Sequence, residues 1–122
     1  MTAPDDIALV DSVIAHARKA QMAFEATGSQ ESYDQAAQAV GWAIMEPTRN
    51  RALAQLAVQT TGLGNVDDKI TKNHRKTLGL LRDIAEAKTY GIISDDPTTG
   101  VTEIARPIGV VGAVVPSTNP AA

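Results

Sequence analysis

A short polar segment near the C-terminal end of the sequence has the residue types and the position for chemistry. It is Pro116-Ser117-Thr118-Asn119-Pro120, which directly follows a continuous apolar run over 108–115. Such a run is typical of a strand buried on both faces of a parallel sheet, and open parallel sheets bind ligands just beyond the carboxyl ends of their strands. An asparagine amide there can donate to a developing oxyanion, so Asn119 is a candidate catalytic residue. The same residue types are also typical of an ordinary loop.

Other residues with chemical potential give weaker signals. The sequence has no cysteine, which excludes disulfides, cysteine-bound metals and a thiol nucleophile within its 122 residues. His16 and His74 have no second histidine at ligand spacing, so we expect no metal site. The stretch 62–67, GLGNVD, matches only the opening of a dinucleotide fingerprint and follows a helical pattern, which favours helix termination and capping.

A basic stretch lies in the middle of the sequence and has two interpretations. It contains Lys69, Lys72, His74, Arg75 and Lys76. The stretch either meets a phosphate-bearing cofactor or forms a solvated helix face, which is the more common case.

Apolar periodicity predicts four helices ahead of the polar segment. The first spans 5–26, and the second begins at Ser29 or Ser32 and ends before Pro47. The third begins at Pro47 and ends at Gly62 or Gly64, and the fourth spans 65–87 with an asparagine N-cap. The positions expected to face a core are Ile7, Val10, Ile14, Ala17 and Phe24 in the first helix, Tyr33, Ala37, Val40 and Ile44 in the second, Leu53, Leu56 and Ala57 in the third, and Ile70, Thr77, Leu81 and Ile84 in the fourth.

The pattern becomes extended after Gly91. We expect a short extended piece at 92–93, a turn over 95–100, a strand over 101–105 and a buried strand over 108–115. Parallel neighbours for the last strand need crossover connections of a dozen residues or more, for which no sequence remains. The pattern therefore indicates the front end of a larger α/β protein, and the alternative is a small complete α+β domain closed by a hairpin.

Composition narrows the class of partner. The net charge of −3 gives no general attraction to nucleic acid or to anionic lipid. The longest uncharged apolar run is about ten residues, too short to span a bilayer. The N-terminus is acidic and lacks the basic region of a secretory signal. We therefore expect a cytoplasmic protein with neither a nucleic-acid nor a membrane partner.

The C-terminal segment also carries a family resemblance. Residues 105–120, ARPIGVVGAVVPSTNP, resemble the first nucleotide-domain strand and the following loop of the aldehyde dehydrogenase superfamily. Pro-Ser-Thr-Asn-Pro, where typical members have Pro-Trp-Asn, resembles the coenzyme A-acylating branch. Residues 61–69 and Lys72-Asn73-His74 resemble the matching helical stretch of that branch. The stretches 72–90 and 100–107 are most similar to the acylating sulfoacetaldehyde dehydrogenases.

The resemblance implies a fold and an activity. The parent fold would be α/β, aldehyde dehydrogenase-like and Rossmann-type, and this chain would be mainly α, with four helices followed by short β-strands. Residues 1–90 would form an N-terminal helical segment, 91–107 a strand pair near the oligomerisation region, and 108–122 the first strand and loop of the nucleotide-binding domain. The full-length enzyme would be a homo-oligomer that oxidises an aldehyde to an acyl-CoA with NAD or NADP, by way of a cysteine thioester.

The resemblance also implies residue roles. Asn119 matches the asparagine whose amide helps to bind the oxyanion, although the spacing from proline to asparagine is longer than in Pro-Trp-Asn. Val115, Pro116, Ser117 and Thr118 match the strand end and loop that line the cofactor cleft.

The sequence departs from the family in one large respect. The family's nucleophilic cysteine lies far beyond position 122, so we expect an N-terminal fragment that is inactive by itself and lacks a microcompartment-targeting extension. The alternative is a non-enzymatic helical module that binds a partner. An independent hydrolase is disfavoured because no nucleophile–base set is evident.

Overall fold

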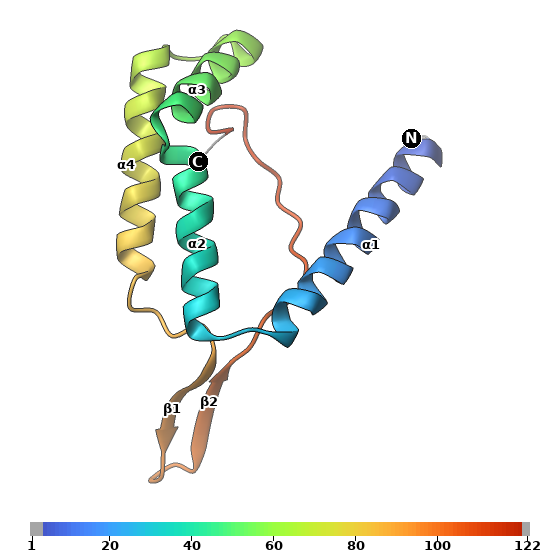
Figure 1. The fold of residues 1–122 in the computed structure, drawn as a ribbon, viewed down its shortest axis with the longest axis vertical. Coiled ribbons are helices and arrows are strands. Elements are labelled where there is room, and N and C mark those ends of the chain that lie inside the picture. Colours follow the sequence, from blue (N-terminus) through green and yellow to red (C-terminus); the bar gives the residue numbers. More distant parts are fainter. Residues whose placement is uncertain (1–3, 121–122) are drawn as a thin grey trace. The chain divides into compact units, whose positions relative to one another are not determined.

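The computed structural model describes residues 4–120, which form four helices and a two-stranded antiparallel sheet (Figure 1). This confirms the predicted order of four helices followed by short strands. The elements are α1 (Pro4–Ala26), α2 (Gln30–Met45), α3 (Pro47–Thr61), α4 (Val66–Ile84), β1 (Gly91–Asp96) and β2 (Val101–Ala105). The chain divides into two compact units, one containing residues 4–30 with 88–113 and the other 31–87 with 114–120.

Local capping chemistry sets both ends of α3 and the start of α4. Pro47 occupies the first turn of α3, and Gly62 ends that helix in the left-handed conformation, with φ of 68°. Asn65 caps α4, because its Oδ1 accepts a hydrogen bond from the Asp68 backbone N–H at 2.9 Å. The C-terminal end of α4 differs from the prediction of 87. The helix ends at Ile84, because the following residues turn more tightly through hydrogen bonds between residues three apart.

The second unit has a small core that is partly polar. Ala54 and Ala57 of α3 are buried, together with four polar residues, Asn50, Lys69, Asn73 and Thr77. Asn73 Nδ2 donates to Asn50 Oδ1 at 3.0 Å, and Asn50 Nδ2 donates to the Ile70 carbonyl at 3.0 Å. These bonds join α3 to α4 and satisfy the amide groups that burial removes from water.

A glycine allows α2 to approach α4, which lies beside it (Figure 1). Gly41 is the buried residue of α2. A Cβ atom at this position would lie 2.6 Å from Leu81 Cδ1 and 3.3 Å from Thr77 Cγ2. The missing side chain therefore leaves room for Leu81 and Thr77 at this point of contact.

The expected apolar faces are mostly open to solvent, which corrects the sequence prediction. Ala57 and Thr77 are buried as expected, but Ile7 is 54% exposed, Val40 65% and Leu56 56%. The described residues bury mainly small and polar side chains, so the larger apolar ones have little to pack against. Periodicity identified an apolar side of each helix, but it does not specify what covers that side.

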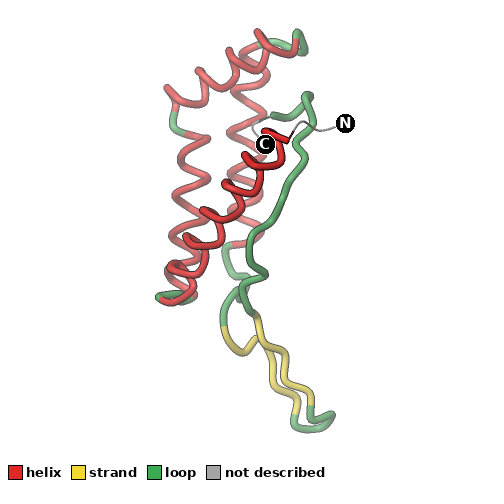
Figure 2. Tube along the Cα trace, turned by 90° about the vertical axis from the view of Figure 1, so that its right-hand side faces the viewer, coloured by secondary structure: helices red, strands yellow, loops and turns green. Residues whose placement is uncertain are grey.

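The first unit contains the predicted strand pair, drawn in yellow in Figure 2. Ile92 pairs with Ile104 and Asp96 with Val101, and the register shifts at Ile93 as in a β-bulge. The Asp96 carboxylate accepts hydrogen bonds from Thr99 Oγ1 at 2.7 Å and from the Thr98 N–H at 2.8 Å. These bonds, led by the Thr99 hydroxyl, hold the pKa of Asp96 below its ordinary value, because they stabilise the ionised carboxylate.

The predicted strand over 108–115 is not formed. This segment is irregular, Ile108 is 91% exposed, and Val114 is fully exposed. A strand is defined by hydrogen bonds to a neighbouring strand, and within 4–120 the only ladder joins β1 to β2. In the first unit, residues 108–112 and α1 together line an open groove of about 680 Å³.

Candidate functional site

The polar segment ends in a turn that is attached to α4. The Asn119 N–H donates to the Pro116 carbonyl at 3.0 Å, which closes a four-residue turn. Lys72 Nζ donates to the Thr118 carbonyl at 3.1 Å and to Asn119 Oδ1 at 2.5 Å. The structure therefore brings Asn119 and Thr118 to one cationic side chain from the middle of the chain.

The other three candidate cofactor residues lie along the approach to this turn. Val115 is 56% exposed, and Pro116 and Ser117 are also exposed. Their backbone follows the irregular segment and enters the turn at Pro116. The turn therefore presents open polar groups next to apolar side chains.

Asn119 also borders an apolar groove of about 740 Å³ between α2 and α4. The groove is lined by Ala36, Ala37, Val40, Gly41 and Ile44 from α2 and by Lys76, Thr77, Leu80, Leu81 and Ile84 from α4. An amide at the edge of an apolar surface forms stronger hydrogen bonds than one surrounded by water, because the local dielectric constant is lower. The arrangement suits a hydrogen-bond donor to a polar ligand atom.

The basic stretch of α4 does not act as one face. Lys69 is buried and lies beside Gly64, whereas Lys72 binds the turn. Arg75 and Lys76 are exposed along a groove of about 650 Å³ that also contains Asp68 and Asp83. Lys72 also lines this groove, so three cations face two acids, and the net charge of +1 gives only a weak preference for an anion.

Sequence reasoning missed the pairing of Lys72 with Asn119. The two residues are 47 positions apart, so no local pattern connects them. The sequence did offer one indication, because Lys72 lies in the stretch Lys72-Asn73-His74 that resembles the acylating enzymes. The resemblance assigned no role to this lysine. Only the fold of the second unit reveals the contact.

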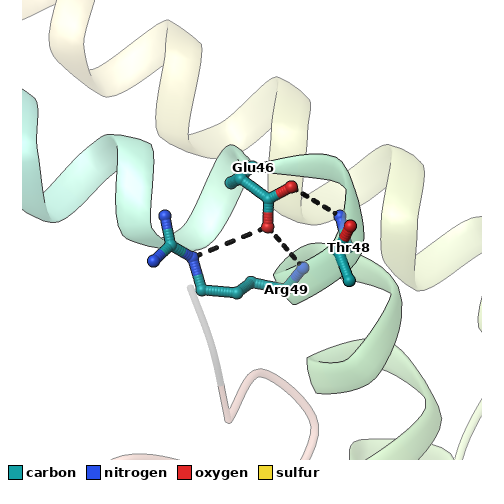
Figure 3. Close-up of polar contacts among 3 residues, drawn as sticks. All are labelled: Glu46, Thr48 and Arg49. Carbon is teal, nitrogen blue, oxygen red and sulfur yellow. Dashed lines mark hydrogen bonds and ion pairs between the residues drawn. The ribbon is translucent and has the colours of Figure 1, made fainter.

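Sequence reasoning also missed the carboxylate that begins α3 (Figure 3). Glu46 accepts hydrogen bonds from the Thr48 N–H at 3.0 Å and from the Arg49 N–H at 2.8 Å, and Arg49 Nε lies 3.7 Å from the same carboxylate. The backbone bonds, led by that of Thr48, lower the pKa of Glu46 below its ordinary value. Its role is to cap the helix that holds Asn50.

Residues 4–120 contain neither a membrane-spanning helix nor a cluster of metal ligands. No helix in this range is long and apolar enough to cross a membrane. No three residues with histidine, cysteine, aspartate or glutamate side chains converge there as metal ligands.

Comparison with known proteins gives several strong matches. The chain is 62% identical, over 93% of its length, to the acylating sulfoacetaldehyde dehydrogenase of Cupriavidus necator. It is 45% identical over 87% of its length to the acylating sulfoacetaldehyde dehydrogenase of Bilophila wadsworthia. It is 34% identical over 94% of its length to the bifunctional aldehyde-alcohol dehydrogenase of Escherichia coli. No family model matches the chain.

These relatives define a class of oxidoreductase. The chain belongs to the acylating aldehyde dehydrogenases, as an N-terminal part of such an enzyme, which confirms the resemblance read from the sequence. Within this class, two of the matched relatives are acylating sulfoacetaldehyde dehydrogenases. The chain spans about 23% of the length of each of these two proteins and 13% of the Escherichia coli enzyme.

Proposed function

We propose that this chain supplies the N-terminal part of an enzyme that oxidises an aldehyde to an acyl-CoA with NAD or NADP. The observation that carries the proposal is the 62% identity with an acylating sulfoacetaldehyde dehydrogenase over 93% of the chain. Sulfoacetaldehyde is the proposed substrate, because three of the relatives are named for it. CoA is the proposed acyl acceptor, because the relatives are named as acylating enzymes.

The proposal assigns a place to each part of the chain. Residues 1–90 form the helical segment, and 91–107 form the strand pair near the contacts between subunits of a homo-oligomer. Residues 108–122 supply the first strand and loop of a Rossmann-type nucleotide-binding domain. The apolar and exposed character of 108–115 supports this assignment, because such a segment becomes a strand once neighbouring strands flank it.

The residues of the turn fit the proposed roles. Asn119 accepts from Lys72 through Oδ1, so its Nδ2–H group is the one oriented to donate to an anionic oxygen. Val115, Pro116, Ser117 and Thr118 present an apolar strand end followed by hydroxyl groups, which suits the edge of a dinucleotide cleft. The nicotinamide cofactor, when bound, supplies the hydride acceptor.

The nucleophile must come from outside these residues. Acyl transfer to CoA through a thioester needs a thiolate, and the 122 residues contain no cysteine. We therefore propose that the chain by itself forms no acyl-CoA.

The proposal is tested with the full-length protein. Sequencing the gene past the codon for residue 122 should reveal a continuing frame that encodes a cysteine. The expressed product should convert sulfoacetaldehyde, CoA and NAD or NADP to a thioester and reduced nicotinamide, measured by mass spectrometry and by absorbance. Reactions without CoA and reactions of residues 1–122 alone are the controls. A product that oxidises the aldehyde but makes no thioester would contradict the acylating assignment.

A further inference from the structure

We propose that Lys72 is a positioning residue, which fixes the orientation of the Asn119 amide so that its N–H group faces the reacting oxygen. The inference rests on the proposed function, because it concerns the oxyanion that forms in that reaction. It adds a role for a residue on α4. Three sets of contacts in the second unit support this role.

The first contact decides which end of the amide faces the lysine. A side-chain amide has one acceptor oxygen and one donor nitrogen, and it can rotate to exchange them. A lysine ammonium carries three donors and no acceptor. Lys72 Nζ, at 2.5 Å from Asn119 Oδ1, is therefore compatible with only one of the two orientations. In that orientation Nδ2 points away from the lysine as a hydrogen-bond donor.

The second contact fixes the backbone that carries the amide. The same ammonium donates to the Thr118 carbonyl at 3.1 Å, and the turn is closed by the Asn119 N–H bond to Pro116. The segment before the turn is exposed and irregular. Lys72 therefore connects an otherwise open loop to a helix.

The third set of contacts makes that helix a firm support. Asn73, the neighbour of Lys72, is buried and bonded to Asn50 of α3. Asn65 caps the same helix two turns earlier. Lys72 itself is half-buried. A positioning group must be held in this way, because small displacements of a catalytic donor are costly.

The chemistry explains why the orientation matters. When a thiolate adds to an aldehyde carbonyl, a carbon–sulfur bond forms and the π-electron pair of the carbonyl moves to oxygen. An Nδ2–H donor stabilises that negative oxygen, whereas the Oδ1 acceptor would repel it. The charged bond from Lys72 also polarises the amide, which strengthens its N–H group as a donor. Lys72 thus acts through Asn119 and does not itself touch the substrate.

A labelling experiment tests the contact without measuring activity. In the full-length protein, limited acetylation with peptide mass spectrometry compares Lys72 with Lys76, an exposed lysine one turn along α4. We expect Asn119→Ala to raise the labelling rate of Lys72 several-fold and to leave that of Lys76 within two-fold, because the substitution frees an ammonium group from an acceptor. An unchanged rate at Lys72 would overturn the proposed contact.

A kinetic double-mutant cycle tests the positioning role in the same protein. We expect Lys72→Met to lower kcat by about ten-fold or more while KM for the aldehyde changes less than two-fold, because donor geometry is lost but substrate binding is not. Lys72→Arg should recover most of the activity, since a guanidinium is also donor-only. Arg82→Met, which removes an exposed cation from the same helix, is the matched control and should retain normal kcat.

The decisive comparison uses an Asn119→Ala background. If Lys72 acts through Asn119, then Lys72→Met causes no further loss of kcat there. An equal loss in both backgrounds would overturn the positioning role and indicate a general structural one.

If Lys72→Met fails to fold, Lys72→Gln replaces it, because a glutamine can accept as well as donate and no longer dictates the amide orientation. A full-length protein that forms no thioester at all would instead contradict the proposed function, while the labelling result would still decide the contact.

Discussion

At the scale of single residues, side chains that bond to the backbone organise this structure more than large apolar groups do. Glu46 begins α3 by accepting two backbone N–H groups, and Lys72 attaches the turn at 116–119 through a carbonyl and an amide oxygen. In each case one charged side chain makes two hydrogen bonds. The pH at which Glu46 changes charge therefore sets the range in which its cap contributes.

The Glu46 cap predicts a pH dependence with a definite sign. Its pKa is lower in the folded chain than in the unfolded one, so its contribution to stability is fully present above the unfolded value. The contribution is lost as pH falls through the lowered folded value. We expect Glu46→Gln to reduce the helix content at pH 7 but to have no effect in strong acid, as measured by circular dichroism. Glu86→Gln, an exposed carboxylate beyond the end of α4, serves as the control. A difference that persists unchanged in strong acid would contradict the capping account.

The buried amide pair gives a second residue-scale prediction. Asn73→Ala removes the donor to Asn50 Oδ1 and leaves that oxygen buried without its partner, which costs about 1–3 kcal/mol. Hydrogen exchange of amides in α3 and α4 should therefore become faster by roughly the corresponding factor of 5–150. Gln55→Ala, at an exposed position of α3, should change exchange little. Unchanged protection in Asn73→Ala would show that the pair does not join the helices.

At the scale of elements, both ends of α3 and the start of α4 could be predicted from the sequence, and the helix surroundings could not. Pro47, Gly62 and Asn65 each act within one turn of their own position, so residue type was sufficient. The strand over 108–115 was wrong for this chain, because a strand depends on neighbours that local sequence does not contain. The contact between Lys72 and Asn119 was missed for the same reason, since it depends on how α4 and the turn come together.

Two helical glycines give a matched prediction for α2 and α4. A methyl group added at Gly79 of α4 would meet nothing within 4 Å, whereas one added at Gly41 of α2 would lie 2.6 Å from Leu81. Gly79→Ala should therefore stabilise its helix by about 0.5–1 kcal/mol through helix propensity. Gly41→Ala should gain less or lose stability, because Leu81 must shift. Hydrogen exchange of α2 and α4 measures both, and an equal gain at the two sites would contradict the close approach of the helices.

At the scale of the whole molecule, exposed apolar surface is the dominant feature. Large apolar side chains are exposed on α1, on α2 and along the segment before the turn, including Val10, Trp42 and Val111. Within each unit, exposed apolar side chains in this number indicate an interaction site or a surface that more chain covers. The proposed enzyme and the alternative partner-binding module share this feature, so solution behaviour must distinguish them.

The two functions predict different behaviour for residues 1–122 in isolation. As a part of a larger enzyme, the chain should show helical circular dichroism, bind a hydrophobic dye, associate with itself and unfold without a sharp transition. Its small polar core supports this expectation. Dye binding measures the exposed apolar surface, light scattering measures self-association, and thermal unfolding monitored by circular dichroism shows whether the transition is sharp. A soluble monomer or defined oligomer that unfolds cooperatively would instead favour the partner-binding module.

We propose that Asn119 is the oxyanion-binding asparagine of an acylating aldehyde dehydrogenase. The most direct test is kcat for thioester formation by the full-length protein and by its Asn119→Ala variant. We predict a loss of about 10²–10³ in kcat, the usual effect of removing one donor to an oxyanion. An Asn119→Ala variant that forms thioester at the normal rate would contradict the claim.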